Sequence, residues 1–327
     1  MPLHINESEV RYLLDMPAAI AAVEQISRKQ SAGEAIVHSR RRIEFPGGGF
    51  FHYMSAADLA AGYVATKQYT FVKGRIRFLV LLYRMDTGEM AAMIEADALG
   101  QLRTGAASGV ATKYLARPDA KVAAIIGTGG QARTQLAAVA AVRNLASARA
   151  YGRNPERRAK FCREMSAQLG IPVTEATSSA AALQDADIVC TATTSSQIVL
   201  HGADLPPGIH INAIGANHAH KRELDDSAVS RASVIFTDSI EQARQEAGDL
   251  ILAFAGDDSR WSSVGELHQL VSGKVPGRQN NSQITLFKSN GLAVWDLAVA
   301  VHVYLRAKEK NLGRELPLWA SEQGGGQ

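Results

Sequence analysis

The chain of 327 residues has few cysteines and little excess charge, and both scarcities exclude classes of protein. Cys162 and Cys190 are its two cysteines and form no CxxC pair, so we expect neither a disulfide framework nor a cysteine zinc site. The formal net charge is +3, and no basic block is longer than the arginine run at residues 40–42. We therefore expect no nucleic-acid partner.

Long apolar runs are missing as well. No stretch has the length of a membrane span, and residues 1–7 lack the basic start and apolar run of a signal peptide. We expect no membrane role and a reducing, cytoplasmic setting. The glycine-rich residues 323–327 are expected to be disordered.

What is present is an ordinary globular composition, with 46% hydrophobic and 20% charged residues, and a length that favours two domains. In the N-terminal part, helical spacing covers residues 16–30. Short extended runs then predict an antiparallel sheet, with turns at residues 47–49 and 86–88; the runs are 42–45, 50–54, 63–67 and 77–83. An alanine-rich helix follows over residues 98–116 and ends at Arg117-Pro118.

From residue 121 the texture becomes an alternation of strands and helices, which is typical of parallel strands with crossover helices. The expected strands are 122–126, 148–151, 187–192, 210–214 and 233–236, and the clearest expected helices run to residue 142 and over 155–169. Apolar residues at helical spacing over 294–305 predict a closing helix that returns to the first domain. The fold class is therefore α/β: a Rossmann-type doubly wound parallel sheet at 119–294, and a discontinuous α+β domain at 1–118 plus 295–327.

The turn after the first parallel strand carries the motif Gly127-x-Gly129-x-x-Ala132. The first glycine permits a tight turn, and the second lets the backbone approach a pyrophosphate at the N-terminus of the next helix. Because the motif lies between a strand and a helix, it predicts dinucleotide binding, with Gly130 and Gln131 beside the phosphates.

The second strand of this sheet ends in Tyr151-Gly152-Arg153-Asn154, without the carboxylate that usually binds the ribose of NAD. An arginine suits the 2′-phosphate of NADP, which it can meet with charge-assisted hydrogen bonds. We therefore expect NADP(H) as the preferred cofactor, bound by Arg153 and Asn154, with NAD(H) possible. The alternative is that Arg153 is a solvated loop residue.

Several segments together resemble the ornithine cyclodeaminase/mu-crystallin family, which includes alanine dehydrogenases and ketimine reductases. Besides the Gly127 turn, these segments are Gln101-Leu102-Arg103-Thr104-Gly105, Gly208-Ile209-His210-Ile211-Asn212-Ala213-Ile214-Gly215, Lys221-Arg222-Glu223-Leu224 and Lys288-Ser289-Asn290-Gly291-Leu292-Ala293-Val294-Trp295-Asp296. The resemblance implies a homodimer formed by the N-terminal domain, and a small imino, keto or amino acid substrate held between the two domains.

The resemblance also assigns site residues. Lys67 matches a lysine at the reacting centre, and Arg40 is chosen for the substrate carboxylate, although Arg41 and Arg42 are adjacent. Arg103 matches an arginine that bridges cofactor and substrate. The remaining matches contact the cofactor (Thr191, Thr193, Ile214, Gly215 and Ser289) or the substrate (Asn290). Independently of the family, an α-carboxylate is best bound by a guanidinium, and an imine is activated by a nearby donor.

One position departs from the family. Cyclodeaminases carry an acid–base aspartate after the central strand, where this chain has Asn217, and an amide cannot exchange a proton as a carboxylate can. Reduction then needs another proton source: Lys67, with His218 or His220 as a relay unless these are plain loop residues. Asp296 either orients Lys67 or the nicotinamide, or favours the start of the last helix through its dipole.

The leading hypothesis is an NADP(H)-dependent reductase that reduces cyclic ketimines or aminates 2-oxo acids. The alternatives are an ornithine cyclodeaminase-like lyase that recycles NAD, and a cofactor-binding protein without turnover. No metal is expected. The substrate pocket is expected to draw on aromatic side chains among Phe51, His52, Tyr53, Tyr69 and Trp295.

Overall fold

The computed structural model describes residues 1–318, so the glycine-rich segment at 323–327 lies outside the described residues. The chain forms two compact units, one of residues 1–103 with those from Leu292 on, the other of Thr104–Gly291. The first division falls inside helix α3 (Asp97–Leu115), whereas the sequence suggested the end of this helix as the boundary. Over residues 1–318, no helix has the length and apolarity that crossing a membrane requires.

The first unit contains a seven-stranded sheet in the order β15-β1-β6-β5-β4-β3-β2. Strands β2 to β6 form an antiparallel meander, and β1 joins β6 in parallel. The strands are β1 (Leu3–Ile5), β2 (Ala35–Glu44), β3 (Phe50–Asp58), β4 (Tyr63–Val72), β5 (Arg75–Arg84), β6 (Met90–Glu95) and β15 (Arg314–Glu315). The predicted antiparallel sheet is confirmed, although β2 begins seven residues earlier than the predicted run at 42–45 and β6 was not predicted.

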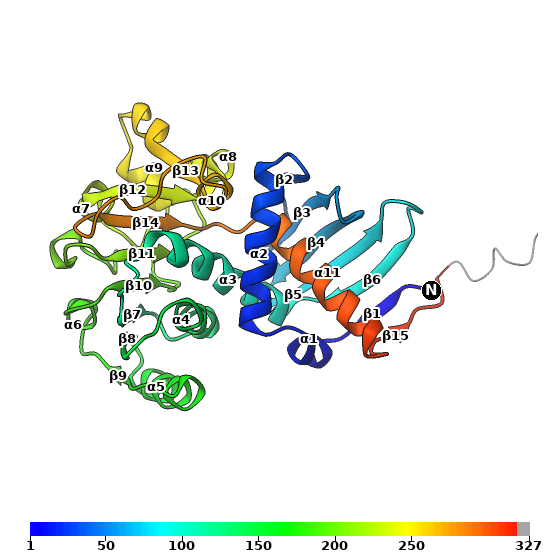
Figure 1. Cartoon of the computed structure of the whole chain (residues 1–327), viewed down its shortest axis with the longest axis horizontal. Coiled ribbons are helices and arrows are strands. Elements are labelled where there is room, and N and C mark those ends of the chain that lie inside the picture. The colour runs from blue at the N-terminus through cyan, green and yellow to red at the C-terminus, as the bar shows by residue number, and fades with distance from the viewer. Residues whose placement is uncertain (319–327) are drawn as a thin grey trace, which may run out of the picture. The chain divides into compact units, whose positions relative to one another are not determined.

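One face of this sheet is covered by helices. Helix α11 (Ala293–Glu309) packs on β2 to β5 and against α2 (Met16–Ser31), with α1 (Glu7–Leu13) beside it (Figure 1). Cross-strand register aligns Met54, Lys67, Val80 and Ile94 across β3 to β6, and all four are buried. Because side chains alternate between the two faces of a strand, this row defines the covered face. Lys67 is its one charged member.

The second unit contains an eight-stranded sheet, parallel throughout, in the order β13-β12-β14-β11-β10-β7-β8-β9. The strands are β7 (Val122–Ile126), β8 (Ser147–Tyr151), β9 (Val173–Glu175), β10 (Ile188–Thr191), β11 (His210–Ala213), β12 (Ala232–Thr237), β13 (Val264–Glu266) and β14 (Ile284–Lys288). The helices are α4 (Gly130–Val142), α5 (Pro155–Leu169), α6 (Ser179–Leu183), α7 (Asp226–Arg231), α8 (Ile240–Glu246), α9 (Gly248–Ala253) and α10 (Leu267–Val271), with short 3₁₀ turns at Gly202–Asp204 and Asp258–Ser263.

Both faces of this sheet are buried, as a doubly wound sheet requires. On one face, Ala123 and Ile125 of β7 pack against α4 and α5, while Ala124 and Ile126 of the same strand belong to a core with α6 to α9 on the other face. The predicted Rossmann-type fold is therefore confirmed. Its topological switch point lies between β7 and β10, because the chain leaves β7 toward β8 and β9 and returns to the other side at β10.

Candidate functional site

Lys67, Arg103 and Asp296 form a buried charged cluster in the first unit. Lys67 Nζ lies 2.7 Å and Arg103 Nε 3.0 Å from the same oxygen, Oδ1 of Asp296. The three side chains come from β4, α3 and the first turn of α11, and their residues are exposed by 4%, 7% and 1%. Two cations share one carboxylate here, so the structure brings together three of the residues that the sequence singled out.

Two atoms of the cluster leave hydrogen-bonding capacity for a ligand. Asp296 Oδ2 and Arg103 Nη1 are buried and have no hydrogen-bond partner among residues 1–318. A buried polar atom without a partner costs about 1–3 kcal/mol, so such atoms are typical of sites that bind a polar molecule. The pair offers an acceptor for an N–H group and a donor for a carboxylate.

The charge state of Lys67 is set by its surroundings. Burial lowers the pKa of the Lys67 ammonium from 10.5 to about 8, with Asp296 raising the pKa and Arg103 and Arg40 lowering it. Gly100 leaves room for the ammonium, since a Cβ there would lie 3.1 Å from Nζ, closer than an ordinary contact. An amine whose pKa is close to neutrality can both give up and regain a proton during turnover.

A bulge in β2 and the burial of the side chains together single out Arg40 in the run 40–42. His38 pairs with Ser55 and Arg41 with Tyr53, so β2 holds one extra residue at this point. The bulge leaves Ser39 and Arg40 together opposite Met54, whose partner on β4 is Lys67. Arg40 is half-buried whereas Arg41 and Arg42 are exposed. Arg40 therefore stays our prediction for the carboxylate.

Aromatic side chains adjoin Lys67 on the covered face. The ammonium lies 5.0 Å from the centre of the Phe78 ring, which contacts Tyr69, and Tyr69 Oη lies 2.6 Å from His52 Nδ1. The register places Phe51 and Tyr53 on the opposite face of the sheet. Their expected place in the same pocket is therefore wrong, because neighbours along a strand point to opposite sides.

The glycine turn after β7 has the geometry that the motif requires. Gly127 adopts a φ of 108°, and a Cβ there would overlap the carbonyl oxygen of Ala192 at the end of β10. Gly129 is the N-cap residue of α4, and a Cβ on it would meet nothing within 4 Å. The turn thus leaves open space beside the N–H groups of a helix start, which fits a dinucleotide pyrophosphate. Gly130 and Gln131 form the first turn of α4.

Other predicted cofactor residues lie at the carboxyl ends of the strands beside this turn. Arg153 is exposed after β8, whereas Asn154 caps α5 by accepting a hydrogen bond from the Arg157 N–H at 2.8 Å. Thr191 is fully buried and donates its hydroxyl to Glu223. Thr193 and Gly215 donate their backbone N–H groups to the same carboxylate, and Ile214 lies next to Gly215.

The loop that bears Ser289 and Asn290 is held by an aspartate that the sequence did not single out. Asp238 is buried after β12 and accepts hydrogen bonds from the Ser289 hydroxyl at 3.2 Å, the Asn290 N–H at 2.6 Å and the Gly291 N–H. Buried roles for Glu223 and Asp249 were not predicted from the sequence either, because an isolated acidic residue is usually exposed. The one available signal was that Glu223 belongs to a segment carrying the family resemblance.

Asn217 lies exposed in the loop after β11, with its amide oxygen 2.9 Å from Nδ1 of His218. His220 is exposed, 5.7 Å from His218 between ring centres. Among residues 1–318 no cluster of histidine, cysteine and acidic side chains has the arrangement of a metal site.

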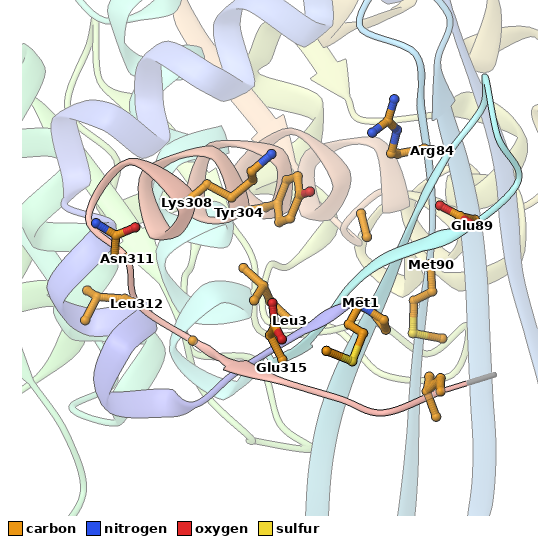
Figure 2. A pocket seen from close by; sticks show the side chains of 14 residues that line it. Met1, Leu3, Arg84, Glu89, Met90, Tyr304, Lys308, Asn311, Leu312 and Glu315 are labelled. Carbon is orange, nitrogen blue, oxygen red and sulfur yellow. The ribbon is translucent and has the colours of Figure 1, made fainter. Parts of the chain in front are cut away.

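An open groove lies elsewhere in the first unit. Arg84, Glu89, Met90, Tyr304 and Lys308 are among the side chains that line it, beside β1 and β15 (Figure 2). Lys67, Arg103 and Asp296 are not part of its lining. The charged cluster, rather than this groove, is therefore the candidate reaction site.

The doubly wound sheet, its glycine turn and the buried lysine cluster place the chain among the NAD(P)-dependent oxidoreductases with a Rossmann-type domain. The sequence model of the ornithine cyclodeaminase/mu-crystallin family matches residues 3–311. The chain belongs to this family, as the sequence motifs predicted.

Relatives of known name match nearly the whole chain. A Delta(1)-pyrroline-2-carboxylate reductase of Bacillus cereus is 34% identical over 96% of this chain and 99% of its own length. The structure of the Thermococcus litoralis Delta(1)-pyrroline-2-carboxylate reductase in complex with NADH and L-proline is similar with a TM-score of 0.92, at 38% identity over 96% of this chain and all of that one. An archaeal alanine dehydrogenase dimer with bound NAD has a TM-score of 0.90, at 31% identity over 97% of this chain and 99% of that one.

Proposed function

We propose that this protein reduces small imino acids to amino acids, with cyclic ketimines as the main substrates and imines formed from 2-oxo acids and ammonia as the second class. The observation that carries the proposal is the buried cluster of Lys67, Arg103 and Asp296, with its unpartnered acceptor and donor atoms. The names of the reductase relatives support the same reaction.

The residues of the cluster, and Arg40 beside them, each have a chemical task in this proposal. Arg40 and Arg103 bind the substrate carboxylate through charge-assisted hydrogen bonds. Asp296 Oδ2 accepts the N–H of a protonated imine, a group that a keto acid lacks. A reduced nicotinamide, when bound, would supply the hydride that the imine carbon takes up. As the π electrons of the C=N bond move to nitrogen, that nitrogen keeps its proton and becomes a neutral amine. Lys67 then donates a proton that converts the amine to the ammonium form of the amino acid, and regains its own proton from solvent.

The cofactor is proposed to bind at the switch point of the parallel sheet. Gly127, Gly129, Gly130 and Gln131 would face the pyrophosphate. The loops after β10, β11 and β14 would contact the rest of the dinucleotide through Thr191, Thr193, Ile214, Gly215 and Ser289. Asn290 would bind the substrate. Carboxyl ends of strands at a switch point are the usual dinucleotide site of such sheets.

We propose NADP(H) as the preferred form, because β8 ends without a carboxylate and the exposed Arg153 follows it. Replacing Arg153 by Ala should raise the KM for NADPH roughly tenfold, the loss of one charged hydrogen bond, and leave the KM for NADH unchanged. Equal effects on both dinucleotides would contradict this preference.

Reduction rather than cyclodeamination is proposed because the loop after β11 carries Asn217 in place of an acid–base aspartate. Ornithine cyclodeamination would need proton exchange at this position in each half of its cycle. A lyase that recycles NAD would form proline from ornithine, which we expect this protein not to do.

We also propose a homodimer formed through the uncovered face of the first sheet. Cross-strand register gathers Ile36, Ile43 and Tyr53 on this face, and they are 47%, 53% and 42% exposed. Exposed apolar side chains on one sheet face are typical of a surface that a second copy covers.

The cytoplasm is the proposed location, since both cysteines are free and buried.

The substrate class is tested with purified protein, NADPH and a matched pair of reactants. Delta(1)-pyrroline-2-carboxylate and Delta(1)-piperideine-2-carboxylate are compared with pyruvate and glyoxylate, the keto acids being tested with and without ammonium. We expect turnover of the cyclic imines and turnover of the keto acids in the presence of ammonium. Oxidation of NADPH by keto acids without ammonium, and by no imine, would contradict the proposal.

A further inference from the structure

Glu223 is a fully buried carboxylate in the loop between β11 and α7, away from the lysine cluster in sequence and in structural unit. Its two oxygens accept three hydrogen bonds: from the Thr191 hydroxyl at 2.7 Å, the Thr193 N–H at 2.8 Å and the Gly215 N–H at 2.8 Å. These donors belong to the segments at the carboxyl ends of β10 and β11. One side chain therefore fixes both segments.

The segment after β10 adjoins the Gly127 turn, and the segment after β11 lies on the far side of β10. Residue 192, between the two threonines, carries the carbonyl oxygen against which Gly127 packs, so the position of this segment also sets the glycine turn. Gly215 has no room for a side chain, because a Cβ there would overlap the Glu223 carboxylate. Glycine at 215 thus lets the carboxylate approach the backbone closely.

A second carboxylate and a lysine hold Glu223 in place. Asp249 Oδ1 accepts the backbone N–H groups of Glu223 at 2.6 Å and Leu224 at 2.9 Å, and Asp249 Oδ2 lies 2.8 Å from Lys288 Nζ. Lys288, at the end of β14, donates to the carbonyl oxygen of Ala216. Glu223, Asp249 and Lys288 are each fully buried and together tie the ends of β10, β11 and β14.

The hydrogen-bond pattern requires a carboxylate. Each contact on Glu223 comes from an N–H or O–H donor, so an ionised side chain satisfies all of them, while a glutamine would turn an NH₂ group toward one or more donors. Burial raises the pKa of Glu223, against the hydrogen bonds and Lys288, which lower it. Burial thus disfavours the charged form of Glu223, and the three hydrogen bonds and Lys288 offset part of that effect.

We propose that Glu223 is the positioning residue of the dinucleotide site. It holds the Thr193 and Gly215 peptides, and through residue 192 the Gly127 turn, in the one arrangement that accepts the cofactor. This deepens the proposed function and rests on one part of it, dinucleotide binding at the switch point. Glu223 should therefore govern affinity for the dinucleotide, with little influence on the affinity for the imino acid.

The test uses the full chain with Glu223→Gln, Glu223→Asp and a control, Asp58→Asn. Asp58 is also buried, at 6% exposure, and pairs with Lys29 at 2.7 Å in the other unit. The dissociation constant of NADPH is measured by its fluorescence in the absence of substrate, beside the melting temperature. We expect Glu223→Gln to weaken NADPH binding roughly tenfold or more, since it leaves a buried donor unsatisfied. Glu223→Asp should recover part of the loss because it keeps the charge.

Steady-state kinetics should separate the effects: the KM for NADPH rises, while kcat at saturating NADPH and the KM for the imino acid stay within about twofold. Asp58→Asn should lower the melting temperature and leave NADPH affinity unchanged. If Glu223→Gln does not fold, Glu223→Asp carries the test, because it keeps the charge and shortens the side chain; a rise of at least about threefold in the dissociation constant is expected.

Wild-type NADPH affinity in folded Glu223→Gln, or in Glu223→Asp where that variant carries the test, would overturn the proposal. An equal loss of affinity in Asp58→Asn would do so as well, by showing that any lost stability weakens binding. Because binding is measured without substrate, a wild-type protein that binds NADPH but reduces no imine would contradict the proposed function and leave this inference standing.

Discussion

At the scale of single residues, the buried ammonium of Lys67 determines what the site can do. Burial lowers the pKa of this ammonium, and the negative charge of Asp296 raises it. Burying a charged lysine on the covered face of a sheet costs desolvation free energy unless the charge is paired. Asp296 pairs with both Lys67 and Arg103, so the site keeps a net positive charge. That net charge suits an anionic α-carboxylate.

The pKa of Lys67, about 8, predicts the pH dependence of imine reduction. Below that pH the ammonium is protonated and can donate; above it the amine is neutral, so kcat/KM should fall as pH rises through about 8. Lys67→Arg, which stays protonated, should lack this alkaline limb. Its kcat/KM should lie roughly 100-fold or more below that of the wild type. The check is a pH profile of kcat/KM for both proteins, with the titration of the imine measured separately. An identical limb in Lys67→Arg would contradict the assignment.

Replacing Asp296 by Asn should have two effects. Without the carboxylate the two cations are buried unpaired, so the free energy of unfolding should drop by about 3–5 kcal/mol. Asp296 raises the pKa of Lys67, so its loss should also move the alkaline limb to lower pH. Chemical denaturation and the pH profile measure the two effects. A limb that moves to higher pH would show that Asp296 does not hold the lysine charged.

At the scale of elements, local irregularities place the site residues. The bulge in β2 and the positive φ of Gly127 are the two clearest cases. The strand, turn and helix around Gly127 were predictable, because the spacing of the glycines and the apolar runs indicate them. Helix α5 was predicted with its observed bounds, from Pro155 to Leu169. The bulge was not predictable, since Arg40, Arg41 and Arg42 have equal propensities and only pairing with β3 separates them.

The bulge predicts different outcomes for two neighbouring arginines. Arg40→Ala should raise the KM for the imino acid roughly tenfold or more, because it removes a charged hydrogen bond to the carboxylate. Arg41→Ala, which alters the exposed face, should leave it within about twofold. Steady-state kinetics at saturating NADPH decide between them. A larger effect at Arg41 would show that the wrong residue of the run was chosen.

The glycine turn gives a second matched pair. Gly127→Ala should lower the melting temperature and abolish measurable NADPH binding, since both its φ and the carbonyl of Ala192 exclude a Cβ. Gly129→Ala meets no neighbouring atom, so its melting temperature should stay unchanged while NADPH binding weakens. Calorimetry and fluorescence titration test both. Unchanged binding in Gly129→Ala would mean that the pyrophosphate lies elsewhere.

At the scale of the whole molecule, the fold class followed from the order of elements, and the family from motifs spread along the chain. The acidic residues that organise the cofactor loops did not follow. Glu223, Asp238 and Asp249 acquire their roles from contacts with residues far away in sequence, and a single sequence does not reveal such contacts. A site residue is thus predictable where its role follows from its chemical type within a motif. It is not predictable where its role depends on tertiary contacts with residues far away in the sequence.

The central claim, reduction of a cyclic imino acid, is tested most directly by following product and cofactor together. The protein is incubated with Delta(1)-pyrroline-2-carboxylate and NADPH, and proline and oxidised dinucleotide are measured for the wild type and Lys67→Ala. We expect one proline for each NADPH oxidised, at a rate that falls roughly 100-fold or more in the variant. No proline from the imine, together with proline from ornithine without net oxidation of NADPH, would contradict the account.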